Sequence, residues 1–224
     1  MVLVAARDEA LRLGATLAAL REAFPEAQLL VADDGSTDAT AQIARGAGAA
    51  VIGEGSPARG KGQAMTAAAR HALQLPGERL FVLCDADLGD SARLLAPLAR
   101  EVGSGRAQVA VAAFTQRRGG GFGVLVACAR AGIRRSCGMR ARAPLSGQRA
   151  LSERALRDVL PFARGYGMEV GMTIDAVRAG HRVAEVQLDL FHREHGRTLA
   201  GFRHRARQLA GVALALTSRS RARA

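Results

Sequence analysis

Two acidic pairs stand directly after apolar segments, where a strand would end. Asp85 and Asp87 follow the apolar residues 80–84, and the acidic cluster 33–38 follows the apolar residues 29–32. In extended chain, residues two apart project to the same side, so Asp85 and Asp87 can reach one hard cation. The carboxyl ends of strands are also where open α/β sheets bind ligands. The pattern therefore predicts a site for a metal-bound diphosphate at one edge of a sheet.

A basic glycine-rich loop, Arg59-Gly60-Lys61-Gly62, precedes an expected helix. Backbone N–H groups, a helix N-terminus and a cation can together bind phosphate oxygens there. Lys61 is the only lysine among the 32 basic residues, so composition does not explain its presence. A solvated loop is the alternative reading.

In the first half of the chain, short apolar segments alternate with alanine-rich stretches. This pattern is typical of βα units around a mostly parallel sheet, whose strands and helices would position the residues above. We expect strands at 1–5, 29–32, 49–52, 80–84, 108–114 and 181–190. We expect helices at 8–24, 37–46, 63–75, 91–102, 151–160, 169–179 and 199–217. The apolar face of the first helix would contain Leu11, Leu13, Leu17 and Leu20, and Ser36, Thr37 and Asp38 are candidate N-caps of the second.

Length and composition limit the classes of protein. The chain has 224 residues and a net charge of +12, which favours anionic partners. It contains no apolar segment long enough for a membrane span and no secretory leader, so we expect a cytoplasmic protein. Its three cysteines lack metal-type spacing. The terminal stretch 199–217 is basic and amphipathic, which leaves open a peripheral contact with the inner membrane face or docking on the core.

Six motifs in this order resemble a family 2 GT-A glycosyltransferase, in particular the dolichyl-phosphate-mannose-synthase-like branch. They are Ala5-Ala6-Arg7-Asp8-Glu9, the 33–38 cluster, the 59–62 loop, Asp85-Ala86-Asp87, Pro144-Leu145-Ser146-Gly147, and the stretch from Gly165 through Glu169 and Glu185 to Arg193. The resemblance implies a GT-A fold, a Rossmann-like and mostly parallel sheet flanked by helices. It covers nearly the whole chain, which we expect to be one domain. Its parts would be a nucleotide-sugar half at 1–114, an acceptor half at 115–198 and a C-terminal helix and basic tail at 199–224.

The resemblance also implies roles for individual residues. The nucleotide sugar would be bound by Ala5, Arg7, Glu9, Asp33, Asp34, Lys61, Asp85, Ala86 and Arg193. The cofactor would be Mg²⁺ or Mn²⁺, with Asp87, Asp85 and His192 as candidate ligands. Glu169 would be the general base and Asp87 would help the diphosphate leave, so both count as catalytic. A turn at 33–38 and a helix N-terminal acid at Glu169 are the structural alternatives.

The function that follows is transfer of a sugar from a UDP- or GDP-sugar to an acceptor, with inversion at the anomeric carbon. The acceptor would be a polyprenyl phosphate or another phosphorylated or anionic molecule. A retaining transferase similar to glucosyl-3-phosphoglycerate synthase is the enzymatic alternative. A basic nucleic-acid-binding module is the alternative of another class, although the low aromatic content argues against nucleic acid. The sequence leaves a homodimer open.

Overall fold

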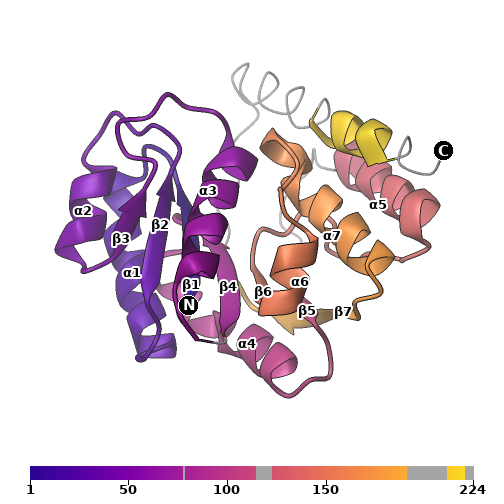
Figure 1. Cartoon of the computed structure of the whole chain (residues 1–224), viewed down its shortest axis with the longest axis horizontal. Helices are drawn as coiled ribbons and strands as arrows, with labels where there is room; N and C mark the ends of the chain where they lie inside the picture. The colour runs from indigo at the N-terminus through magenta and orange to yellow at the C-terminus, as the bar shows by residue number, and fades with distance from the viewer. Residues whose placement is uncertain (78, 115–122, 191–210, 220–224) are drawn as a thin grey trace.

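The structure is a computed structural model that describes residues 1–77, 79–114, 123–190 and 211–219 (Figure 1). The strands are β1 (Val2–Ala6), β2 (Leu29–Asp33), β3 (Ala50–Ile52), β4 (Leu80–Asp85), β5 (Val109–Phe114), β6 (Arg149–Ser152) and β7 (Val183–Leu188). The α-helices are α1 (Ala10–Ala23), α2 (Thr40–Gly46), α3 (Lys61–Gln74), α4 (Ala96–Gly103), α5 (Gly123–Cys137), α6 (Glu153–Asp158) and α7 (Met168–Arg178). Two 3-10 helices, η1 (Gly89–Leu95) and η2 (Gly165–Gly167), and a helical segment at 211–219 complete the described elements.

The described strands form one seven-stranded sheet in the order β3-β2-β1-β4-β6-β5-β7. All neighbouring pairs are parallel except those of β6, which runs antiparallel to both β4 and β5. This confirms the expected mostly parallel sheet flanked by helices. The sequence analysis missed β6 and was wrong to begin a helix at residue 151, because α6 begins only at Glu153.

Helices cover both faces of the sheet. One face packs on α1, α2, η1 and α4 through a core that contains Leu13, Leu17 and Leu20. The other face packs on α3, α6 and α7, with Met65 and Met172 in its core. Figure 1 shows α3 beside β1 and β4, and α6 and α7 beside β6. Asp85 projects to this second face, as Leu83 does, whereas Asp33 projects with Val31 to the first face.

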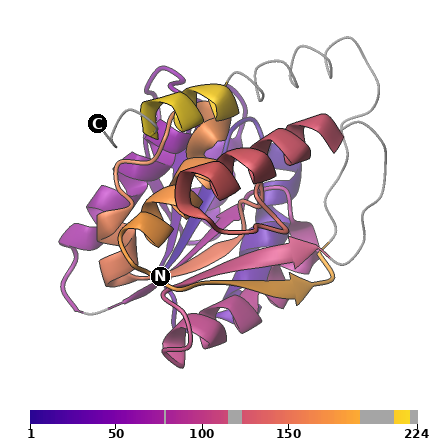
Figure 2. The ribbon, with the colours of Figure 1, turned by 90° about the vertical axis from the view of Figure 1, so that its right-hand side faces the viewer.

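A smaller outer core joins α5, α7 and the helical segment 211–219, which lie together in both Figure 1 and Figure 2. Gly132 of α5 and Gly167 of η2 let this segment approach closely, since a Cβ at Gly132 would meet Leu216 side-chain atoms at 2.4 Å. Val212 and Ala215 of the segment are buried. The expected terminal helix is therefore present over 211–219, where it docks on the core, and residues 199–210 lie outside the described residues.

Several local expectations were wrong. Leu11 is 97% exposed, so it does not belong to the buried face of α1. Of the side chains expected to cap α2, those of Ser36 and Thr37 instead bond Asp8 in the loop after β1. Asp38 Oδ1 does accept from the N–H of Thr40, the first residue of α2, at 2.9 Å, and its Oδ2 accepts from the N–H of Ala10 at 3.1 Å. The expected helix at 91–102 is divided into η1 and α4, and α5 was not foreseen.

Across the described ranges, none of the helices combines the length and the apolar character that crossing a membrane requires. The three cysteines are free thiols, and burial, together with the Asp85 charge, raises the pKa of Cys84 in the core.

Candidate functional site

The acidic residues of the two motifs lie at one edge of the sheet. In the parallel register, Ala5 of β1 is beside Asp85 of β4, and Ala6 is beside Asp33 of β2. The carboxyl ends of the three central parallel strands therefore meet, as the sequence predicted. The helix α3 begins at the same edge, because its N-terminal residue Lys61 reaches Asp85.

Lys61 joins carboxylates from two other elements. Its Nζ lies 2.6 Å from Oδ1 of Asp85 on β4 and donates at 2.7 Å to Oε1 of Glu169 on α7. Burial alone would lower the pKa of the Lys61 amine, but the two carboxylates outweigh it and raise that pKa. In this structure the amine predicted to bind phosphate is held by two carboxylates.

The second oxygen of Asp85 is also bound. Gln148 Nε2 donates to Asp85 Oδ2 at 2.8 Å, and Gln148 Oε1 accepts from the Ser146 hydroxyl at 3.2 Å. Between them, Gly147 approaches the ion pair so closely that a Cβ there would lie 2.7 Å from both Asp85 Oδ2 and Lys61 Nζ. The Ser146-Gly147 motif therefore forms one wall of the site.

Sequence reasoning missed Gln148 and Arg149. Arg149 has the largest of the fully buried side chains in the described part of the chain. Its Nε donates to the Ser146 carbonyl at 2.9 Å and its Nη1 to Thr173 Oγ1 at 2.9 Å. Burial lowers the pKa of Arg149 to about 10, and Glu169 and Glu185 act in the opposite direction. The available signal was two polar residues that directly follow the Ser146-Gly147 motif.

Asp87 lies just beyond β4 and differs from Asp85 in its surroundings. Its Oδ1 is buried and has no hydrogen-bond partner among the described residues. Burial and the nearby charge of Asp87 raise the pKa of Glu9, despite the bond from Arg12 Nη1 to Glu9 Oε2 at 2.8 Å. Asp87 and Glu9 thus present carboxylate oxygens that feel each other's charge, and such hard oxygens are the ligands that a divalent cation prefers.

Asp33 and Asp34 are largely buried, and their carboxylates support loops. Asp33 Oδ1 accepts from the N–H and the hydroxyl of Ser36, which is the turn that the sequence left as an alternative. Asp34 Oδ1 accepts from the backbone N–H groups of Arg59 and Gly60, both at 2.8 Å. These two N–H groups of the glycine-rich loop are thus bound to Asp34, in contrast to the phosphate contact expected for the loop backbone.

The loop after β1 faces the acidic cluster. Asp8 adopts a left-handed φ of +52° and accepts from the N–H of Thr37 at 2.7 Å. Arg7 Nη1 lies 3.8 Å from Asp34 Oδ2 and remains more than half exposed. The N–H of Glu9 donates to Thr40 Oγ1 at 2.9 Å. These contacts fix the two motifs to each other.

The two alanines predicted to contact the nucleotide sugar, Ala5 and Ala86, bond each other through their backbones, and their contact with the donor stays a prediction. The side chain of Ala86 is buried in the core, its N–H donates to the carbonyl of Ala5 at 3.0 Å, and its own carbonyl accepts from Thr16 at 2.7 Å. Ala86 thus has a structural role in which both backbone groups are bound. His192 and Arg193 lie outside the described residues.

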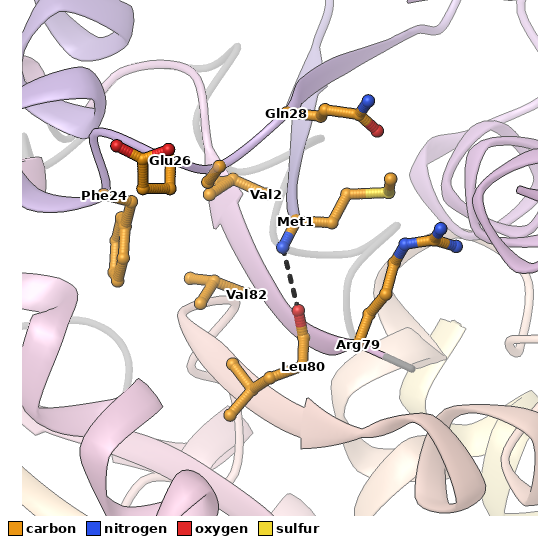
Figure 3. Close-up of a pocket in the computed structure, with 9 residues that line it drawn as sticks. Met1, Val2, Phe24, Glu26, Gln28, Arg79, Leu80 and Val82 are labelled. Atoms are coloured by element: carbon orange, nitrogen blue, oxygen red, sulfur yellow. Dashed lines mark hydrogen bonds between the residues drawn. The ribbon is translucent and has the colours of Figure 1, made fainter. Parts of the chain in front are cut away.

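A separate pocket lies at the other edge of the sheet (Figure 3). It has a volume of about 420 Å³ and is lined by residues at the starts of β1, β2 and β4, including Met1, Gln28 and Leu80. Because the strands run in parallel, this pocket is at the amino edge and apart from the acidic site.

Known proteins resemble this chain in sequence and in fold. The family model "Glycosyl transferase family 2" matches residues 1–127. The chain belongs to glycosyl transferase family 2. This membership confirms the resemblance to family 2 that the motifs indicated. It also confirms the predicted class of enzyme, a glycosyltransferase. A curated relative is Glycosyltransferase AglJ of Haloferax volcanii, 29% identical over an alignment of 178 residues that covers 76% of this chain and 56% of AglJ.

Solved structures of glucosyl-3-phosphoglycerate synthase from Mycobacterium tuberculosis are similar over 97% of this chain. One is 27% identical with a TM-score of 0.77 and 79% of its chain covered. Another, in complex with Mn²⁺, UDP and phosphoglyceric acid, is 30% identical with a TM-score of 0.79 and 77% covered. This likeness confirms the GT-A fold. The mannose-synthase-like branch stays a prediction.

Proposed function

We propose that this protein transfers a sugar from a UDP-sugar to a small phosphorylated acceptor, with Mn²⁺ or Mg²⁺ bound at Asp87. The observation that carries the proposal is the buried Asp87 Oδ1, which has no hydrogen-bond partner in the described part of the chain. An unpaired carboxylate oxygen at the carboxyl edge of a parallel sheet is costly unless a ligand uses it.

The acidic edge fits a divalent cation. Glu9 and Asp87 are close enough for the charge of Asp87 to raise the pKa of Glu9, and both groups offer hard oxygen ligands. No three His, Cys, Asp or Glu side chains within the described ranges gather as a complete metal site. A metal held through Asp87 would then share its coordination with diphosphate oxygens. When bound, the metal supplies positive charge for the departing diphosphate.

Residues of three elements would bind and orient the substrates. Arg7 is exposed beside Asp34, where it can meet the donor, and α3 presents its N-terminus at the same edge. Glu169 is proposed as the base toward the acceptor hydroxyl, held in place by Lys61. The Lys61 ammonium has three N–H donors and bonds two carboxylates, so it can also donate to a phosphate oxygen. Asp33 and Asp34 are proposed to contact base and ribose through the oxygens that the loop contacts leave available.

Two observations favour a small phosphorylated acceptor over a lipid-linked one. Related structures contain small phosphorylated molecules: phosphoglyceric acid in one, and glycerol 3-phosphate with UDP-glucose and Mn²⁺ in another, which is 29% identical with a TM-score of 0.73. In this chain, the segment 211–219 turns Val212 and Ala215 toward the core. These two apolar side chains are therefore covered by the protein, whereas Leu214 of the same segment remains 59% exposed.

A thermal-shift titration tests the donor site. Wild-type protein, Asp87→Asn and Asp158→Asn would be titrated with UDP and GDP, each with and without Mn²⁺. Asp158 is the matched control, because it pairs with His181 at 2.8 Å near the start of β7, away from the acidic edge.

We expect a shift of the wild type and of Asp158→Asn by UDP only when Mn²⁺ is present, and a loss of that shift in Asp87→Asn. Equal shifts in Asp87→Asn would exclude Asp87 as the metal ligand. A shift with GDP alone would reassign the donor base. Release of UDP from UDP-glucose, measured with 3-phosphoglycerate and with glycerol 3-phosphate, then tests the acceptor, and the absence of release with either would contradict the proposed class.

A further inference from the structure

Arg149 is buried on a strand that contributes directly to the centre of the sheet. It begins β6, where it is paired in register with Leu83 of β4 and Val111 of β5, and its exposed fraction is 0%. Burying a guanidinium is costly unless charged and polar partners surround it. The function proposed above assigns it no role.

The guanidinium connects the two carboxylates that Lys61 bridges. On one side, Nη1 donates to Thr173 Oγ1, and that hydroxyl donates to the carbonyl of Glu169 at 3.0 Å, one turn earlier on α7. The link fixes the first turn of α7, from which the Glu169 side chain projects toward Lys61.

On the other side, Arg149 Nε donates to the carbonyl of Ser146 at 2.9 Å. The Ser146 hydroxyl bonds Gln148, and Gln148 donates to Asp85. Lys61 then bonds both Asp85 and Glu169, so the contacts close into a ring. The members of this polar ring are Lys61, Asp85, Gln148, Ser146, Arg149, Thr173 and Glu169.

We propose that Arg149 is a positioning residue that, through Thr173 and Ser146, holds Glu169 and Asp85 at the separation that the Lys61 amine bridges. The part of this inference that concerns catalysis rests on the proposed function, but the positioning itself does not. The ring joins α3, β4, β6 and α7. Strand pairing already connects β4 to β6, and α3 and α7 pack on this face of the sheet through apolar side chains.

Two observations favour positioning over simple filling of the core. Arg149 Nη2 is buried and has no hydrogen-bond partner among the residues that the structure describes. Complete hydrogen bonding of the guanidinium therefore does not explain why an arginine is buried at this position. Gly147 approaches Lys61 Nζ and Asp85 Oδ2 at distances that leave no space for a side chain, so a small movement of the 146–149 segment would displace the ion pair. The ring is balanced in charge, with two cations and two carboxylates.

The single lysine provides a direct test. Protein labelled with ¹⁵N-lysine contains one side-chain amine, Lys61, and amine acetylation followed by peptide mass spectrometry reports on the same group. Thr173→Val removes the hydroxyl that links Arg149 to Glu169, whereas Thr173→Ser retains it. Arg149→Met removes the hub, and Leu98→Val, in the core of the opposite face, controls for general loosening.

We expect Thr173→Val and Arg149→Met to shift the Lys61 ¹⁵Nζ resonance and to raise its acetylation rate at least about tenfold, because an amine released from its ion pair exchanges and reacts faster. Thr173→Ser and Leu98→Val should resemble the wild type. The same Lys61 signal in folded Thr173→Val as in the wild type would overturn the proposal, and so would equal effects of Thr173→Val and Leu98→Val. If Arg149→Met does not fold, the Thr173 pair decides.

Donor binding separates this inference from the proposed function. Wild-type binding of UDP with Mn²⁺, measured by calorimetry, tests the proposed function alone. If the wild type binds, Thr173→Val should retain the affinity for UDP–Mn²⁺ within about threefold and lose turnover, because Arg149 orients the Lys61 pair and not the metal at Asp87. A parallel loss of affinity and turnover in Leu98→Val would show a general loss of structure and contradict positioning.

Discussion

Replacement of Lys61 by methionine should destabilise the protein in a way that depends on pH. Lys61 Nζ is 2.6 Å from Asp85 and 2.7 Å from Glu169, and the exposed fractions of the three side chains are 25%, 24% and 9%. Removal of one partner from a buried ion pair costs about 3–5 kcal/mol. Because two of these side chains retain about a quarter of their surface, solvent screening reduces the expected loss to about 2–4 kcal/mol near neutral pH.

The sign of the pH dependence follows from the charges. In the wild type, burial would lower the pKa of Lys61, but Asp85 and Glu169 raise it above the ordinary value. The amine therefore contributes its full stabilisation below about pH 10, and this contribution is lost only as the pH rises through the folded-state pKa. The deficit of Lys61→Met relative to the wild type should therefore shrink as the pH rises above about 10.

Urea denaturation of wild type and Lys61→Met at about pH 7 and about pH 11 measures both effects. The double variant Lys61→Met/Glu169→Gln serves as the control, because it also removes one buried negative charge. It should regain about 1–2 kcal/mol relative to the single variant. A deficit below about 1 kcal/mol, or one that is identical at the two pH values, would refute the reasoning.

Two further predictions concern packing and thiol chemistry. Gly62→Ala would place a Cβ 1.9 Å from the Ala163 carbonyl and should destabilise the protein by about 3 kcal/mol or more. A Cβ at Gly46 would meet nothing within 4 Å, so Gly46→Ala should stabilise the protein by about 0.5–1 kcal/mol. Urea denaturation of both variants tests the contrast. Burial raises the pKa of the Cys84 thiol, so iodoacetamide should modify the exposed Cys128 in the native protein and Cys84 only after unfolding, as peptide mass spectrometry would show. Native modification of Cys84 at the rate of Cys128 would contradict the burial of that strand.

Much of the central sheet could be predicted because its signals are local. Apolar runs that end in Asp33 and Asp85 mark strands by composition, and parallel strands deliver their ends to one edge. The strand β6 was missed because it has four residues and begins with an arginine, which reads as surface. Only the strands on both sides of it, β4 and β5, make that position buried.

In the candidate site, too, some features are encoded locally and others depend on contacts between distant parts of the chain. Residue types and their local spacing were enough to identify the chemical groups: two acidic motifs after strands, one lysine at the start of a helix and a late glutamate. Their partners depend on the packing of distant elements, since Lys61 and Glu169 are 108 residues apart and meet because α3 and α7 pack on one face. Ion pairing depends on distance and burial, and neither is encoded in the local pattern of residues. Hence the sequence indicated a phosphate-binding lysine, and the fold placed that amine between two carboxylates.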